Sequence, residues 1–126
     1  MENARNVTLC CLLALCSLGL SGCGKKADEN KPISEVQAEA EKMDLDALRS
    51  MAMAYKDAIT AKKADIEKIT AKLKNIPVTQ MLGEEAKALK SDIENLNKSI
   101  SALTERFQIY YNKLKEKGGD VSGLKI

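Results

Sequence analysis

The chain has 126 residues, with 20 lysines and arginines, 18 aspartates and glutamates, and a formal charge of +2. This length fits one ordinary domain, and so small a charge does not favour nucleic acid or an acidic substrate as a partner. Aromatic residues make up 3% of the chain, with one Phe and no Trp, so neither a large aromatic core nor a base-stacking surface is expected.

The first feature along the chain is an uncharged apolar run, from Val7 to Leu20, which follows a short segment containing Arg5. A run of this length is shorter than the roughly 20 residues that span a bilayer, and it has the size of the apolar region of an export signal. We therefore expect residues 1–22 to be a removable signal peptide rather than a permanent membrane helix.

The run ends with Leu20, Ser21, Gly22 and Cys23. This pattern of an aliphatic residue, two small residues and a cysteine resembles the lipobox of bacterial lipoproteins. The resemblance implies that Cys23 carries a thioether-linked diacylglyceryl group, that the signal is cut immediately before it, and that the new amine can be acylated. Two or three acyl chains, at about 0.8 kcal/mol per buried methylene, make such an anchor effectively permanent. The alternative is an ordinary signal, or a buried hydrophobic helix, with a chance cysteine.

Cysteine usage agrees with this interpretation, because Cys10, Cys11 and Cys16 would leave with the signal and Cys23 would remain. No disulfide is then possible within one mature chain, so its stability must come from packing or from association. The resemblance implies an exported, membrane-anchored protein. Position 24 is glycine, not the acidic residue that favours inner-membrane retention in enterobacterial lipoproteins, which implies the outer membrane, facing the periplasm, in a Gram-negative cell.

A polar stretch follows, so residues 23–33 are predicted to be a flexible tether that begins with the lipidated cysteine. Ser34 and Gln37 have the spacing of a helix capping box, in which each side chain satisfies the free backbone amide of the other residue. A short helix is therefore predicted over residues 34–43. Asp44 favours a break and a fresh helix start.

Two long runs then alternate spacings of three and four, which is the pattern of a heptad seam. The first run comprises Leu45, Leu48, Ala52, Tyr55, Ile59, Lys62, Ile66, Ile69, Leu73 and Ile76. The second comprises Leu82, Ala86, Leu89, Ile93, Leu96, Ile100, Leu103, Phe107, Tyr110 and Leu114. Each run covers about 32 residues, which corresponds to a helix of roughly 48 Å.

Between the runs, Pro77 lacks an amide proton and moves its preceding residue out of the helical region, so the chain is predicted to reverse over residues 75–79. The predicted fold is all-α: an antiparallel two-helix coiled-coil hairpin over residues 44–117, with a short N-terminal helix. Gly83 lies either in the first turn of the second helix or in the loop, and the register depends on which of these holds.

Two further features concern the hairpin itself: a lysine within the seam and a glycine pair at its end. Lys62 interrupts the seam, where it either selects a partner or, as we favour, lays its stem along the core and extends its amine into solvent. Gly118 and Gly119 follow the last seam residue, where a helix C-cap belongs, and residues 118–126 are predicted to be a flexible tail.

The sequence offers little for catalysis or metal binding. It has no His, and the mature chain would have no second Cys, which excludes the usual zinc sites and His-activated nucleophiles. The adjacent carboxylates Glu84 and Glu85 are better explained by a helix start than by acid–base chemistry. We predict no catalytic residue, no metal site, no cofactor beyond the covalent lipid, no small-molecule substrate and no nucleic-acid partner.

A second apolar row runs beside the seam of the first helix, and off-seam apolar residues of the second helix fall at the same end of the hairpin. These residues are Ala47, Met51, Ala54, Ala58, Ala61, Ala102, Ile109 and Tyr111. Because a lone hairpin buries only one seam, we predict that another chain or the short helix packs on this surface, near the lipid. The alternative is that the alanines merely favour helix and are exposed singly.

These features predict a non-catalytic, lipid-anchored envelope protein. Its hairpin would pair with itself in a homo-oligomer or with another envelope protein. The alternative is a periplasmic chaperone-like module that holds hydrophobic or unfolded clients, by analogy of fold alone. A stable oligomer would favour the first function, and suppression of the aggregation of an unrelated protein would favour the second.

Overall fold

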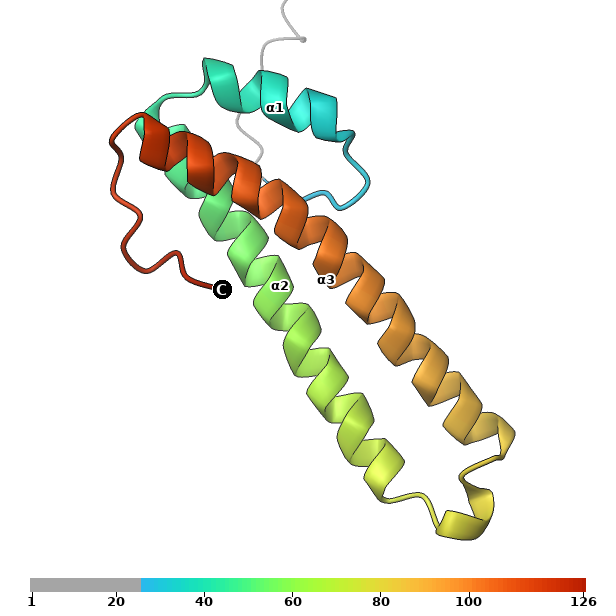
Figure 1. Ribbon diagram of the computed structural model, residues 1–126. Helices are drawn as coiled ribbons and strands as arrows, with labels where there is room; N and C mark the ends of the chain where they lie inside the picture. Colours follow the sequence, from blue (N-terminus) through green and yellow to red (C-terminus); the bar gives the residue numbers. More distant parts are fainter. Residues whose placement is uncertain (1–25) are drawn as a thin grey trace, which may run out of the picture.

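The computed structural model describes residues 26–126, so the expected signal peptide, its recognition residues Leu20, Ser21 and Gly22, and Cys23 lie outside the described residues. The described chain is helical, with α1 (Ile33–Lys42), α2 (Leu45–Lys74), a short 3-10 helix η1 (Val78–Gln80) and α3 (Glu84–Glu116). Helices α2 and α3 run antiparallel, and α1 packs across α3 at the end opposite η1 (Figure 1). The predicted all-α hairpin with a short N-terminal helix is confirmed.

The predicted break at Asp44 is confirmed, but the predicted cap of the first helix is wrong. The Asp44 carboxylate accepts a hydrogen bond of 2.7 Å from the Ala47 amide and caps α2. Helix α1 instead begins one residue earlier than predicted, after Pro32, whose carbonyl accepts from the amides of Glu35 and Val36. Ser34 therefore lies inside the first turn, where its hydroxyl cannot act as an N-cap.

The reversal at Pro77 is confirmed, and the position of Gly83 is now clear. Gly83 has an extended backbone and precedes α3, so it belongs to the loop. Leu82 is consequently 83% exposed and not a seam residue, and Leu45, at the start of the first predicted run, is also exposed. The seam of α3 begins at the buried Ala86.

The glycine cap of α3 is present as predicted. Gly118 has a φ of +76°, which glycine adopts without steric cost. The Gly118 amide donates to the Lys115 carbonyl at 3.0 Å, and the Gly119 amide donates to the Leu114 carbonyl at 2.8 Å. These paired bonds form a Schellman motif and satisfy the last carbonyls of the helix.

Buried side chains are concentrated in one half of the hairpin, which we call the base (residues 26–62 and 100–126). The buried apolar residues of the base are Val36, Ala40, Leu48, Met51, Ala52, Tyr55, Ile59, Leu103, Phe107, Tyr110, Leu114 and Leu124. At the centre of this cluster the Tyr55 and Tyr110 rings stack with centroids 5.6 Å apart. The core therefore joins α1, both long helices and the C-terminal end.

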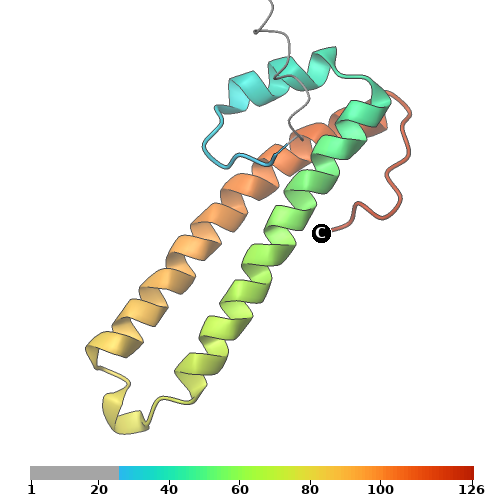
Figure 2. The ribbon, with the colours of Figure 1, turned by 180° about the vertical axis from the view of Figure 1, so that it is seen from behind.

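The other half of the hairpin, which we call the arm (residues 63–99), is packed more loosely. Ala86 is buried there, but the larger seam residues of the arm are only half-buried. Figure 2 shows α2 and α3 crossing at the base and diverging along the arm. None of the helices within residues 26–126 is both long enough and apolar enough to cross a membrane.

Both chain ends were predicted to be flexible, and the structure packs the described part of each against the hairpin. In the C-terminal segment (residues 118–126), Leu124 is fully buried, and Arg49 donates to the carbonyls of Asp120 and Ser122. In the N-terminal segment (residues 26–32), Ala27 packs against the core. The hairpin leaves apolar surface at its base, and these ends cover it.

Candidate interaction surface

The predicted interaction residues do not form one open surface. Met51 is buried and Ala61 is exposed, whereas the other six are half-buried. Ile109 lies beside α1, in a shallow hollow that includes Gln37 and Lys113. Tyr111 lies beside the C-terminal segment and stacks on Phe107, with ring centroids 5.6 Å apart. The short helix α1, one of the two occupants predicted for this surface, and the C-terminal segment therefore occupy much of it.

The N-terminal segment is held to α2 by two contacts. The Tyr55 hydroxyl accepts from the Asp28 amide at 3.2 Å and donates to the Asp28 carbonyl at 3.0 Å. The Lys62 amine forms an ion pair of 3.4 Å with the Glu29 carboxylate. The Lys62 side chain is therefore half-buried, and its amine meets a carboxylate of this segment. The segment that was predicted to be a free tether lies over this part of α2 and supplies a charge partner.

Arg106 of α3 holds the same segment from the other helix. Its side chain is 8% exposed, and its Nε and Nη2 donate to the Lys31 carbonyl at 2.8 and 2.6 Å. Its Nη1 donates to the Ala102 carbonyl at 2.7 Å. A buried charge is tolerated when its donors are satisfied, and these three bonds satisfy most of the guanidinium. Sequence reasoning missed this role because Arg106 has the pattern of a solvated charge beside a seam.

Glu39 of α1 joins this network. The Tyr110 hydroxyl donates to Glu39 Oε2 at 3.3 Å, and the Lys31 amine pairs with the other carboxylate oxygen. Burial raises the pKa of the Tyr110 phenol above its ordinary value of 10, and the neighbouring Tyr55 and Glu39 add to this shift. Tyr110 therefore remains a neutral hydrogen-bond donor at any physiological pH.

Ion pairs fasten the end of α1 to α3. The Lys113 amine lies 2.5 Å from Glu41 and 2.8 Å from Glu116. Its hydrogen bonds to Glu116 and then to Glu41 raise the pKa of Lys113, and the hydrogen bond and charge of Lys113 lower the pKa of Glu41. The Lys117 amine adds hydrogen bonds to the carbonyls of Glu41 and Met43.

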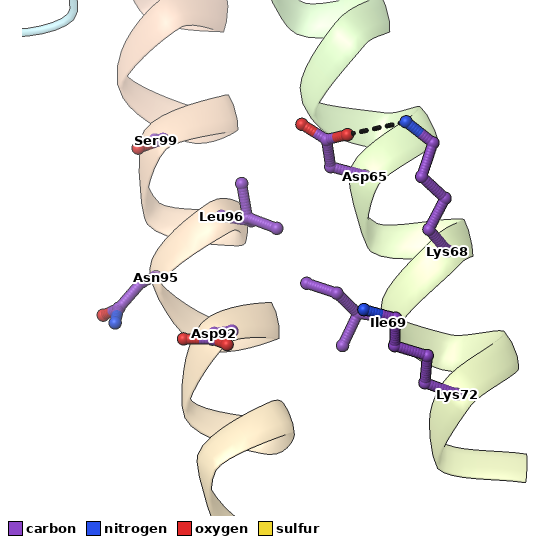
Figure 3. A pocket seen from close by; sticks show the side chains of 8 residues that line it. All are labelled: Asp65, Lys68, Ile69, Lys72, Asp92, Asn95, Leu96 and Ser99. Atoms are coloured by element: carbon purple, nitrogen blue, oxygen red, sulfur yellow. Dashed lines mark hydrogen bonds and ion pairs between the residues drawn. The ribbon is translucent and has the colours of Figure 1, made fainter. Parts of the chain in front are cut away.

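The arm contains a groove between α2 and α3, which we call the arm groove. Its volume is about 490 Å³, and it is lined by Asp65, Lys68, Ile69, Lys72, Asp92, Asn95, Leu96 and Ser99. Figure 3 shows the Ile69 and Leu96 side chains pointing toward one another across the space between the helices. Polar side chains surround these two, and Lys68 pairs with Asp65 at 3.1 Å. The groove therefore has an apolar centre and a polar, mixed-charge rim.

Residues 26–126 contain no group of three or more His, Cys, Asp or Glu side chains that could hold a metal ion. Comparisons with protein-family models, with curated proteins and with solved structures gave no match for this chain. Three features of the chain itself bear on its function: the lipobox-like motif at Cys23, the closed base and the open arm.

Proposed function

We propose that this chain is a non-catalytic, lipid-anchored envelope protein that presents a helical hairpin to a protein partner. The partner is a second copy or another envelope protein, and in a Gram-negative cell the site is the periplasmic face of the outer membrane. Leu20, Ser21, Gly22 and Cys23 support the anchor by their resemblance to a lipobox. The hairpin that follows supports an interaction role, because other segments of the chain cover only its base. The side chains of the arm are left accessible.

The observation that carries this proposal is the contrast in burial between the base and the arm. The base is closed by the chain's own ends, whereas the arm has a half-buried seam. At the tip of the arm, Val78 is 88% exposed and Leu82 is 83% exposed. Exposed apolar residues that gather in one place favour a partner there. These exposed residues support a partner site on the arm rather than on the base, where the second apolar row had suggested it.

The anchor is tested by growing cells with an alkyne-tagged fatty acid and detecting the tag on the purified chain. We expect the wild-type chain to carry the tag at Cys23. The Cys23→Ser variant should lack the tag and accumulate as the longer precursor, because removal of a lipoprotein signal follows lipid attachment. An untagged wild-type chain, or equal tagging of both chains, would refute the anchor.

The partner site is tested by photocrosslinking in intact cells. A photoreactive residue replaces Val78 or Leu82 at the tip of the arm, and replaces the exposed Asp57 in the base as a control. We expect discrete protein adducts from the arm positions and none from position 57. Adducts only from position 57, or none from any position, would contradict the proposal. The masses of the adducts separate a second copy from a different protein.

The arm groove favours a second candidate function, that of a chaperone-like module. Ile69 and Leu96 offer apolar surface between helices that are not closely packed, and such surface suits a hydrophobic client segment. A chaperone-like module should suppress the aggregation of an unrelated, reduced protein at a near-equimolar ratio. Ile69→Asp should remove this effect. No suppression by the wild-type chain would eliminate this candidate.

A further inference from the structure

The chain enters the folded domain at the side of the hairpin and not at its end. Asp28 contacts Tyr55, and Glu29 contacts Lys62. Tyr55 lies ten residues after the start of α2 and Lys62 lies twelve residues before its end. At 1.5 Å per residue, these contacts are about 15 Å from the base end of α2 and about 18 Å from its tip end. The point of entry is therefore near the middle of the rod.

The entry point lies on the same face of the hairpin as the arm groove. On α3, Arg106 bonds to Lys31, and positions seven and fourteen residues earlier are Ser99 and Asp92, which line the groove. On α2, Lys62 contacts Glu29, and Ile69, seven residues later, lines the groove. Helical residues seven apart differ by only about 20° in direction. The N-terminal segment and the groove thus follow one continuous face.

The C-terminal segment covers a different face. The Lys56 amine donates to the Gly123 carbonyl, and Lys56 lies about 120° around α2 from Lys62, because each helical residue advances the direction by about 100°. Figures 1 and 2 show α1 and the C-terminal segment on different sides of the hairpin. The two faces of the arm are therefore distinguishable: one continues from the N-terminal segment, and the other from the C-terminal segment.

The length of chain between Cys23 and the packed Ala27 limits how far the domain can stand from its anchor. Three residues lie between these positions, so the link has four residue-to-residue steps. A fully extended chain covers at most about 3.6 Å per step, or about 14 Å in total. A hairpin standing on its base end would need about 15 Å, and one standing on its tip would need about 18 Å. The link is shorter than the tip-down arrangement needs, and it approaches the base-down distance only when it is fully stretched, which costs chain entropy. A hairpin lying on its side needs no such stretching.

We propose that the hairpin lies along the membrane surface, with the face that carries the N-terminal segment and the arm groove turned toward the lipid headgroups. This orientation rests on the proposed lipidation of Cys23. The groove rim brings the Lys68 and Lys72 amines to the level of the headgroup phosphates. The opposite face of the arm and the tip, with Val78 and Leu82, stay accessible to a protein partner.

The orientation is tested on the lipidated full-length product, purified after expression with its own signal and reconstituted into vesicles of phosphatidylethanolamine and phosphatidylglycerol. Lys72→Cys and Lys63→Cys form a matched pair, because both side chains are exposed on the arm and lie about 180° apart around α2. Each new thiol is labelled with the same fluorophore. The vesicles carry a quencher on the lipid headgroup.

We expect the headgroup quencher to reduce the fluorescence of the position-72 label at least about three-fold more than that of the position-63 label. Equal quenching at the two positions, or stronger quenching at position 63, would overturn the orientation. A further variant inserts a Gly-Ser linker of about twelve residues between Lys26 and Ala27, which adds roughly 20 Å of average reach. The difference between the two labels should then largely disappear, and its persistence would refute the short link as the cause.

This experiment distinguishes a failure of the proposed lipidation from a failure of the proposed orientation. Chains that do not float with the vesicles and lack the mass of the lipid would refute the lipidation of Cys23. Chains that float with the vesicles and carry the lipid, but show equal quenching at positions 63 and 72, would refute the orientation alone.

Discussion

The base and the arm of the hairpin share one sequence pattern but differ in how their side chains are buried. Ile59 in the base is 1% exposed. Ile69, ten residues later on the same seam of α2, is only half-buried and borders a groove. The difference arises because α1 and both chain ends cover the base, whereas the arm consists of two helices alone. A heptad pattern thus sets which side of a helix faces inward. The solvent exposure of that side depends on whether a third layer packs over it.

The polar contacts of the two regions differ in the same way. In the base, Arg106 and Tyr55 bond to main-chain atoms of a segment far away in the sequence. In the arm, the ion pairs are local and exposed, such as Lys68 with Asp65 and Lys87 with Glu84. Exposed pairs of this kind contribute only about 0.2–0.5 kcal/mol. The long-range polar contacts that hold the tertiary structure are therefore concentrated in the base.

The largest expected contrast comes from the same substitution in both regions. Ile59→Ala should lower the free energy of unfolding by about 3 kcal/mol, because it opens a cavity in a closed core. Ile69→Ala should lower it by only about 1 kcal/mol, since that side chain is already partly hydrated. Urea denaturation of the chain from residue 24 onward measures both values. Equal losses would show that the arm is as well packed as the base.

A second contrast concerns leucines at the two ends of the molecule. Leu124→Ala should cost about 2.5 kcal/mol, because the fully buried leucine belongs to the base core. Leu82→Ala, at an 83% exposed tip position, should change the stability by less than about 0.5 kcal/mol. Thermal denaturation followed by circular dichroism separates the two. A neutral Leu124→Ala variant would restore the earlier expectation of a loose tail.

Arg106→Met tests whether the Arg106 hydrogen bonds fix the N-terminal segment to α3. The variant leaves the Lys31 carbonyl without its two donors, and the expected loss is about 1.5 kcal/mol. Amide hydrogen exchange of α1 should accelerate, while exchange in the arm should not change. Arg49→Met is the matched control, because Arg49 also donates to carbonyls but is more exposed. A loss at Arg49 as large as that at Arg106 would contradict the special role of the buried site.

The smallest expected effect is a dependence of stability on pH. Lys113 lowers the pKa of Glu41 below its ordinary value of 4.5. Because the folded state has the lower pKa, the ionised pair stabilises the fold above pH 4.5, and this contribution is lost as the pH falls through the folded pKa. The thermal midpoint should therefore fall with acidification in this range, and Glu41→Gln should reduce that slope. Identical slopes would show that the pair does not fasten α1.

The elements of this fold follow from local sequence signals. Asp44 starts α2, Pro77 reverses the chain and Gly118 ends α3, because each effect depends on a side chain and the few backbone groups beside it. The failed cap at Ser34 is also instructive. The motif was present and would put the N-cap at Ser34, but the N-cap of α1 is Pro32, two residues earlier.

The candidate sites were less predictable. The lipobox-like motif at Cys23 remains a prediction from the sequence. The second apolar row predicted that the base has more apolar surface than one seam uses, but it left open whether another chain or the short helix covers that surface. Most of the covering comes from α1 and the two chain ends, which moves the proposed partner site to the arm.

The sequence by itself determined the helices, their ends and the antiparallel hairpin, because those features depend on neighbouring residues and on a strong repeat. Only the tertiary structure decided that residues 26–32 and 118–126 pack on the base, that Arg106 is buried and that the arm stays open. The contacts responsible join residues about 70 positions apart, such as Arg106 with Lys31 and Arg49 with Ser122. No local pattern encodes such contacts, because they form only after the hairpin has brought both ends of the chain to the same place.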